Sequence, residues 1–251
     1  CHIYDNSAVT GGVFYEATVT ISNTEISGTD VDNDGGVFYE STAYIVSSSI
    51  HSNTAGRYGG VFYGSTANVT SSNIYSNSVG DSGAVVMNGV ANFYNTKVYS
   101  NICSNHAIFS GNTGTIVNSL IYDNSTTVAN KGIFNNFSGK IINTTIVDNN
   151  DVVFRLADSA KSMELVNSLV LGNFDNGSYF DNVVVSYSYL SDTSLPGSMQ
   201  VDAPRYGFDT TQFVDYSNDD FGLVSWSVLV NNGSNILYNN NSNIADDVSG
   251  D

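Results

Sequence analysis

The pentapeptide GGVFY occurs three times in this chain of 251 residues, and each copy begins 24 residues after the one before. The copies occupy residues 11–15, 35–39 and 59–63. A unit this short cannot bury its own hydrophobic face, so it is stable only when it stacks on neighbouring units. The spacing therefore predicts a repeat fold before any other property of the chain is considered.

Three columns of apolar residues continue the period after the pentapeptide itself has changed. Short apolar segments separated by Gly, Ser, Asn, Asp or Thr predict three short strands per repeat, joined by turns. Within residues 43–47 and 91–95 the side chains alternate at period two, which is strand spacing. The columns are Phe14, Phe38, Phe62, Val85, Ile108, Phe134 and Phe154; Ile21, Ile45, Val69, Phe93, Ile116, Ile141 and Leu165; and Ile26, Ile50, Ile74, Val98, Ile121, Ile146 and Val170.

Two polar columns accompany the apolar ones. Asn tolerates the left-handed conformation that corners require, and its amide can hydrogen-bond to the local backbone and to the same amide one repeat away. We interpret both columns as structural corners without chemistry. They are Asn23, Ser47, Ser71, Asn95, Asn118, Asn143 and Asn167; and Asn6, Thr29, Asn53, Asn77, Asn101, Asn124, Asn149 and Asn173.

These columns predict an all-β fold, a single-stranded parallel β-helix with about 24 residues per coil and coils about 4.8 Å apart. Residues 1–190 hold about seven to eight coils. The period is lost in residues 191–251, where both prolines and Trp226 occur. Because the end of a β-helix exposes unpaired strand edges and open core, we expect this segment to form an irregular C-terminal cap and tail.

The repeat resembles that of the chlamydial polymorphic outer-membrane proteins and of other β-helix surface proteins. The resemblance rests on two glycines, an aliphatic residue, Phe and Tyr, followed by a strand and then by Ile-x-x-Asn, as at residues 74–77. Residues 167–173 and 225–233 are similar to the closing segment of large secreted β-helix proteins of prokaryotes. The resemblance implies a right-handed helix, an extracellular or cell-surface location in a prokaryote and an adhesin-like role.

The charge balance argues against several kinds of partner. Seven Lys and Arg residues stand against 24 Asp and Glu residues, which gives a formal charge of −17. Such a chain repels nucleic acid and anionic lipid. We therefore expect no nucleic-acid partner and no direct membrane insertion of this segment, and leave a surface glycan, a protein or other copies of the chain as partners.

The strongest indication of an ion site is the string Asp30-Val31-Asp32-Asn33-Asp34-Gly35. Carboxylates at alternate positions can surround one hard cation, and the glycine permits a sharp turn. An EF-hand would need Glu at the twelfth position, which is Ser41 here. Asp30, Asp32 and Asp34 are thus candidate ligands of calcium, with a solvated acidic loop as the alternative.

A second candidate site is aromatic. If the phenylalanines of GGVFY point inward, period two turns Tyr15, Tyr39 and Tyr63 outward at coil spacing. An exposed tyrosine column can stack on sugar rings or anchor a protein partner. The alternative is that the tyrosines pack on one another and cover the strand.

No residue is assigned a catalytic role. The basic residues are scattered, and the motifs of β-helical polygalacturonases are missing apart from an Asp-Asp pair at 219–220. The spacing assigns no carboxylate partner to His2, His51 or His106. Glu16 and Glu40 occupy equal positions of adjacent coils, close to the separation of a retaining glycosidase, but repetition alone explains this.

We therefore predict a non-enzymatic extracellular or cell-surface stalk or adhesin module that binds glycan or protein through its lateral surface. Two alternatives stay open: a self-assembling structural protein of a surface filament or layer, and a polysaccharide lyase or glycosidase. An enzyme would show acids with raised pKa values, or Lys or Arg beside calcium, in a groove. An adhesin would show exposed aromatic residues without them.

Overall fold

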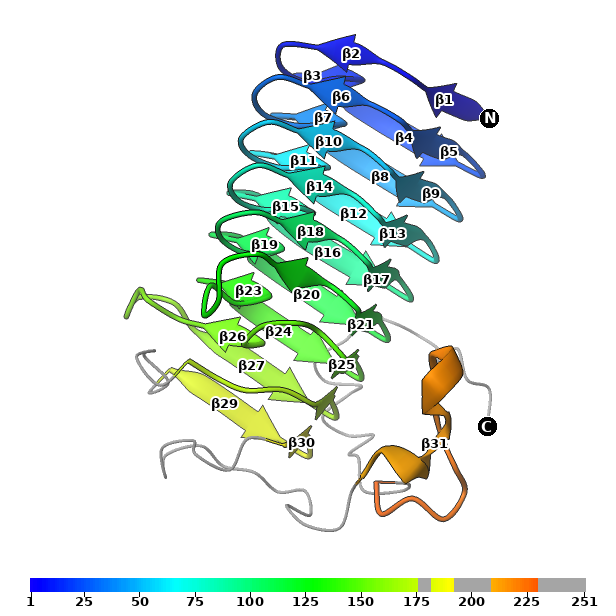
Figure 1. Ribbon diagram of the computed structural model, residues 1–251, viewed down its shortest axis with the longest axis vertical. Helices are drawn as coiled ribbons and strands as arrows, with labels where there is room; N and C mark the ends of the chain where they lie inside the picture. The colour runs from blue at the N-terminus through cyan, green and yellow to red at the C-terminus, as the bar shows by residue number, and fades with distance from the viewer. Residues whose placement is uncertain (176–181, 192–208, 230–251) are drawn as a thin grey trace.

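The chain folds into a parallel β-solenoid of about eight turns, as the 24-residue period predicts (Figure 1). The structure is a computed structural model, and it describes residues 1–175, 182–191 and 209–229. Each complete coil passes through four sheets in turn, and neighbouring strands within each of these sheets pair in parallel and belong to successive coils. The predicted all-β class and parallel β-helix are thus confirmed.

The first two sheets contain the strand that follows the glycine pair and the longest strand of each coil. The seven-stranded sheet contains β3 (Phe14–Tyr15), β7 (Phe38–Tyr39), β11 (Phe62–Tyr63), β15 (Val86–Met87), β19 (Phe109–Ser110), β23 (Phe134–Asn135) and β26 (Phe154–Arg155). The eight-stranded sheet contains β4 (Thr18–Ser22), β8 (Thr42–Val46), β12 (Thr66–Thr70), β16 (Val90–Tyr94), β20 (Thr113–Val117), β24 (Ser138–Ile142), β27 (Met163–Val166) and β29 (Val183–Ser186).

The other two sheets complete the coil, and one of them was not predicted. The nine-stranded sheet contains β1 (His2–Tyr4), β5 (Glu25–Ser27), β9 (Ser49–His51), β13 (Asn73–Tyr75), β17 (Lys97–Tyr99), β21 (Leu120–Tyr122), β25 (Thr145–Val147), β28 (Leu169–Val170) and β30 (Tyr189–Leu190). The unpredicted six-stranded sheet contains β2 (Ser7–Ala8), β6 (Asp30–Val31), β10 (Thr54–Ala55), β14 (Ser78–Val79), β18 (Ile102–Cys103) and β22 (Ser125–Thr126).

The strand registers confirm two of the three apolar columns in full and correct the third. The first column continues from Phe62 through Val86 and Phe109 rather than through Val85 and Ile108. The preceding Val85 and Ile108 are also fully buried. Hydrophobicity therefore does not distinguish the two neighbours, and only the backbone register does.

The corners between sheets depend on residues with a left-handed backbone. The column from Asn23 to Asn167 has φ between 48° and 51° at all seven positions, as predicted. In the second polar column the left-handed residue is the one before the amide, such as Ser52 before Asn53 and Ser76 before Asn77. A third corner was not predicted; its left-handed residues are Glu16, Glu40, Gly64, Asn88, Gly111 and Asn136.

Buried polar side chains join successive coils at these corners. The amide Nδ2 of Asn53 donates to Oδ1 of Asn77 at 2.9 Å, and the bond repeats at 3.0 Å from Asn77 to Asn101. Asn124 and Asn149 continue the ladder. A ladder of hydroxyl groups, which sequence reasoning missed, follows the first corner: the backbone N–H groups of Thr24, Ser48, Thr96, Ser119, Thr144 and Ser168 each donate to a hydroxyl of the next coil.

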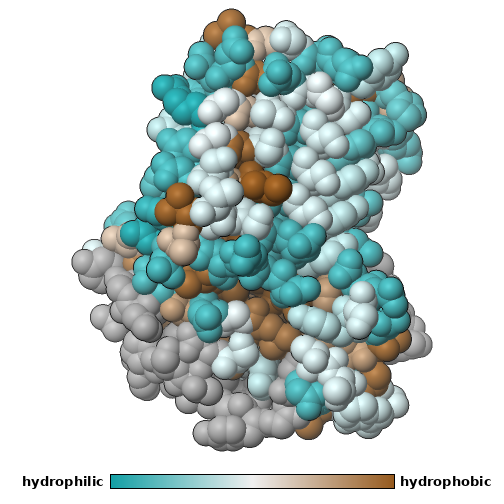
Figure 2. Space-filling view, viewed as in Figure 1, coloured by the Kyte–Doolittle hydropathy of each residue, from teal (hydrophilic) through white to brown (hydrophobic). Residues whose placement is uncertain are grey.

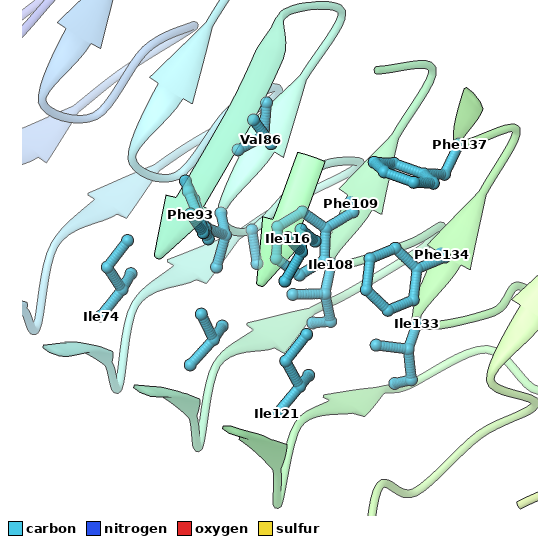
Figure 3. Close-up of a cluster of buried hydrophobic side chains, with 14 of the residues drawn as sticks. Ile74, Val86, Phe93, Ile108, Phe109, Ile116, Ile121, Ile133, Phe134 and Phe137 are labelled. Carbon is cyan, nitrogen blue, oxygen red and sulfur yellow. The ribbon is translucent and has the colours of Figure 1, made fainter. Parts of the chain in front are cut away.

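One continuous hydrophobic core fills the coils from end to end. Figure 3 shows the side chains of Phe93, Phe109 and Phe134 directed into the space between the sheets, among the isoleucines of neighbouring coils. The phenylalanine rings stack along the axis, with centroids 4.8 Å apart for Phe38 and Phe62. The stacked rings thus fill this part of the core at the same spacing as the paired strands of successive coils.

The described part of the C-terminal segment lies beside the lower coils. It consists of η1 (Thr210–Gln212), β31 (Phe213–Asp215), η2 (Tyr216–Asn218) and β32 (Asp220–Leu223) (Figure 1). Phe213 and Phe221 pack with Tyr122, Val147 and Leu169 on the outer face of the nine-stranded sheet. The described residues of the predicted cap thus cover a lateral face, while residues 192–208 and 230–251 of that segment lie outside the described residues.

The surface of the solenoid is mainly hydrophilic. In the space-filling view, hydrophilic and intermediate side chains cover the upper coils, and hydrophobic side chains form scattered groups (Figure 2). Among residues 1–175, 182–191 and 209–229, no helix has the length and hydrophobicity needed to cross a membrane.

Candidate functional site: a lateral tyrosine ridge

Tyr15, Tyr39 and Tyr63 form a continuous stack on the outer side of the seven-stranded sheet. We refer to these three residues as the tyrosine ridge. β3, β7 and β11 pair in register, so each tyrosine lies directly beside the next one. The ring centroids of Tyr15 and Tyr39 are 5.0 Å apart, and those of Tyr39 and Tyr63 are 5.2 Å apart.

The period-two alternation of the strand sets the direction of these side chains. Phe38 and Phe62 are fully buried, whereas Tyr15 is 53% exposed and Tyr39 and Tyr63 are half-buried. The interplanar angles within the ridge are only 5° and 16°. Stacking therefore covers both faces of the Tyr39 ring, and a bound molecule would meet ring edges and hydroxyl groups there.

A glutamate follows each of the first two tyrosines of the ridge. Glu16 and Glu40 are exposed and have left-handed backbones, with φ of 48° and 45°. The pKa of the Tyr15 phenol is raised, first because it hydrogen-bonds the Glu16 carboxylate and then because that charge disfavours a phenolate. Burial raises the pKa of Tyr39, and the charge of Glu40 adds to the effect. The ridge is therefore an acidic aromatic surface on which the Tyr15 and Tyr39 phenols stay neutral.

An arginine lies beside the ridge against a fourth tyrosine. The guanidinium carbon of Arg57 is 4.9 Å from the ring centroid of Tyr58. Tyr58 in turn lies 6.2 Å from Tyr63, with nearly parallel rings. The Arg57 Nε and Nη2 atoms donate to Oδ1 and Oδ2 of Asp34 at 3.0 and 2.6 Å, which is a bidentate ion pair. Sequence reasoning missed this pair because its partners lie on different coils.

The three aspartates of the candidate calcium site have different surroundings. Asp30 and Asp32 are exposed, whereas Asp34 is buried and bound to Arg57. No group of three or more His, Cys, Asp or Glu side chains that could hold a metal ion occurs within the described residues. A guanidinium, and not a cluster of carboxylates, thus accompanies Asp34 in this structure.

A second aromatic column lies on the outer face of the nine-stranded sheet and was missed at the sequence level. His51 and Tyr75 stack with centroids 4.6 Å apart, and Tyr99 and Tyr122 continue the column at 4.9 and 5.0 Å. Phe221 of the C-terminal segment meets Tyr122 edge-on at 5.3 Å. The available sequence signal was the aromatic residue two positions before each ladder asparagine, as at Tyr75 before Asn77. Because the C-terminal segment covers one end of this column, it is a weaker binding candidate than the ridge.

Each histidine has a carboxylate partner, which corrects the sequence analysis. His2 Nδ1 and His51 Nε2 lie 3.0 and 2.9 Å from the two carboxylate oxygens of Glu25. His106 Nε2 lies 3.6 Å from Asp81. The partners lie on neighbouring coils, at separations that a local motif search does not reach. The contacts join coils across the surface.

Fold and site together define a parallel β-solenoid with an acidic aromatic ridge on one lateral face. No family model, no curated protein and no solved structure matches the chain. The chain is therefore classified by its fold alone, as a parallel β-solenoid.

Proposed function

We propose that the chain is a non-enzymatic binding module of an extracellular or cell-surface protein, similar in role to an adhesin or stalk. The observation that carries the proposal is the tyrosine ridge, a stack of three outward tyrosines on a rigid sheet. Tyrosines supply large amphipathic contact area and lose little side-chain entropy when they are already held in place. The proposed partner is a surface glycan or a protein.

The location is supported by the composition of the corners. Only 12% of the residues are charged, and the left-handed and ladder positions are mainly Asn, Ser and Thr. This pattern fits the resemblance of the GGVFY repeat to the chlamydial polymorphic outer-membrane proteins and to secreted prokaryotic β-helix proteins. We extend that resemblance to a cell-surface or secreted location in a prokaryote.

The non-enzymatic character is supported by ion pairs that engage several of the basic residues. A β-helical lyase acting on an anionic polysaccharide needs an unpaired Lys or Arg as base. Three of the seven basic residues are paired with carboxylates: Arg57 is bound by Asp34, Lys140 lies 3.1 Å from Glu164, and Arg155 lies 3.3 Å from Asp175. These contacts fit basic residues that stabilise adjacent coils.

The proposal is tested by binding to glycan and peptide arrays. We expect Tyr39→Ser/Tyr63→Ser to weaken binding of a captured probe by at least about thirtyfold, because two interface tyrosines that contribute about 1–2 kcal/mol each amount to about 2–4 kcal/mol. The matched control is Tyr44→Ser, because Tyr44 is 48% exposed on the outer face of the eight-stranded sheet. Urea unfolding checks that all variants fold. Equal retention of every captured probe by the ridge variant and the wild type would refute the proposal.

A further inference from the structure

The geometry of the ridge restricts what it can bind. Carbohydrate rings pack against the faces of aromatic side chains. Both faces of Tyr39 are covered, by Tyr15 at 5.0 Å and by Tyr63 at 5.2 Å. A gap of this size admits no further ring. A ligand that lies along the ridge therefore contacts the edge and the hydroxyl of Tyr39, which is unfavourable for a sugar that depends on stacking.

The charged groups along the ridge are hydrogen-bond acceptors, and each carboxylate keeps acceptor sites beyond the one that the neighbouring phenol hydroxyl uses. An ionised carboxylate accepts hydrogen bonds and donates none. Glu16 and Glu40 project from the corner immediately after β3 and β7, and both are exposed. Neither takes part in an ion pair within the part of the chain that the structure describes. The groups that complement them are hydrogen-bond donors with a positive charge.

The side chain of Arg57, which lies beside the ridge, shows how an aromatic ring and a carboxylate can hold a cationic group. The Arg57 guanidinium packs over Tyr58 at 4.9 Å and donates two hydrogen bonds to Asp34. An aromatic ring and a carboxylate thus hold a guanidinium together. Tyr39 and Glu40 offer the same two kinds of group one coil away, although the ring presents its edge and hydroxyl there.

The charge of the whole chain favours the same kind of partner. With 24 acidic and seven basic residues, the chain attracts cations at long range and repels acidic partners. We propose that the ridge binds a Lys- or Arg-rich segment of a partner protein, whose cationic side chains donate to Glu16 and Glu40 while its backbone and aliphatic stems pack along the tyrosine edges. This inference rests on the proposed function, because it takes the ridge as the binding surface.

The test uses the full chain and two probes. One probe is a short synthetic peptide of alternating lysine and glycine, and the other is a neutral cello-oligosaccharide. Calorimetric titration at physiological ionic strength limits long-range attraction, because the screening length is then about 8 Å. We expect the lysine peptide to bind and the oligosaccharide not to bind.

Charge-matched variants separate ridge recognition from adsorption by net charge. Glu16→Gln/Glu40→Gln removes two negative charges at the ridge and is expected to weaken peptide binding about fivefold, as two exposed ion pairs would. Asp123→Asn/Asp148→Asn removes two exposed charges from left-handed corner positions immediately after β21 and β25, on the nine-stranded sheet, and is expected to leave the affinity within about twofold. A salt titration should show a shallower slope only for the glutamate variant.

Three outcomes contradict the inference, and they bear differently on the proposed function. Equal weakening by both double variants would mean that net charge alone holds the peptide. Binding of the oligosaccharide alone, abolished by Tyr39→Ser/Tyr63→Ser, would overturn the cationic partner but keep the ridge as a binding site. If substitution of the ridge tyrosines changes binding of neither probe, both the inference and the use of the ridge are wrong.

Discussion

Single buried amides and hydroxyl groups hold the corners of this fold. Asn77 is fully buried, and its Nδ2 donates to the Ile50 carbonyl and to Asn101 Oδ1, both at 3.0 Å. Its own Oδ1 accepts from the backbone N–H and the side chain of Asn53. One side chain thus satisfies groups on the coils before and after its own, and no apolar residue can replace it without leaving buried polar atoms unpaired.

The residue-scale prediction concerns this ladder. Asn77→Ala is expected to lower the free energy of unfolding by about 2–4 kcal/mol, since it leaves a buried carbonyl and a buried N–H without partners. Asn68→Ala is the control, because the half-buried Asn68 also accepts an inter-coil amide bond, from Asn92 at 3.0 Å. Urea unfolding should give a loss below about 1 kcal/mol for Asn68→Ala. Equal losses would show that burial of the ladder is unimportant.

A second residue-scale prediction concerns alkaline pH. Burial raises the pKa of Tyr122 to about 12, while a tyrosine of the unfolded chain ionises near about 10. Between these values the unfolded state loses a proton that the folded state keeps. This contribution to stability is therefore complete below pH 10 and is lost as the pH rises through the folded pKa. Tyr122→Phe should make unfolding less pH-dependent in that window, and an unchanged pH dependence in this variant would contradict the assignment.

At the scale of elements, the glycine pair before each strand of the tyrosine ridge has two separate tasks. Gly35 has φ of +71°, which the turn requires. Gly36 has no such φ, but a Cβ atom there would lie 2.1 Å from the carbonyl oxygen of Gly60 on the next coil. The first glycine therefore permits the turn, and the second permits close approach of the coils.

Gly36→Ala is accordingly expected to destabilise the fold by about 1–3 kcal/mol, because the neighbouring backbone must move. Gly64→Asn is the contrasting variant. Gly64 has φ of +57°, but Glu16 and Glu40 adopt the same conformation at the equivalent corner. Asn tolerates it well, so the change should stay within about 0.5 kcal/mol. Denaturant midpoints compare the two variants, and a tolerated Gly36→Ala would contradict the close-approach explanation.

The repeat made most of the strands predictable from the sequence. The strands and contacts that were missed are those that no constant residue type marks. The columns through Ile45 and Ile50 were readable because every coil repeats them. The fourth strand was not, because its inward side chain changes from Ala55 to Val79, Cys103 and Thr126 along the column, so that no constant large apolar residue marks it. The outward tyrosines of the ridge followed from period two. The Asp34–Arg57 pair did not, because pairing across coils depends on backbone register.

At the scale of the whole molecule, the described C-terminal segment binds the solenoid from the side. Phe213, Tyr216 and Phe221 pack on one another and on the column that ends at Tyr122. This cluster is separate from the core inside the coils. The sequence did not predict where residues 209–229 pack, because they do not continue the repeat and so have no equivalent residues on the coils. The segment and the coils should therefore differ in local stability.

The whole-molecule prediction tests this separation by hydrogen exchange. Phe221→Ala removes the ring that meets Tyr122, so amide exchange in residues 209–229 should become at least about tenfold faster, in line with a loss of about 1.4 kcal/mol or more. Exchange in β8, β12 and β16 should stay unchanged. Trp226→Ala is the control, because Trp226 is 64% exposed. Faster exchange throughout the coils would show that the two clusters unfold as one unit.

The asparagine ladder has a direction. From Asn53 to Asn124 each Nδ2 donates to the Oδ1 of the following coil, with Asn149 as the last acceptor, so these amide dipoles all point the same way along the axis. Aligned dipoles polarise one another, and an amide with partners on both sides is held more firmly than one at an end. The solenoid axis therefore has an electrical polarity as well as a chain direction, and fraying of the ladder proceeds from its ends towards Asn101.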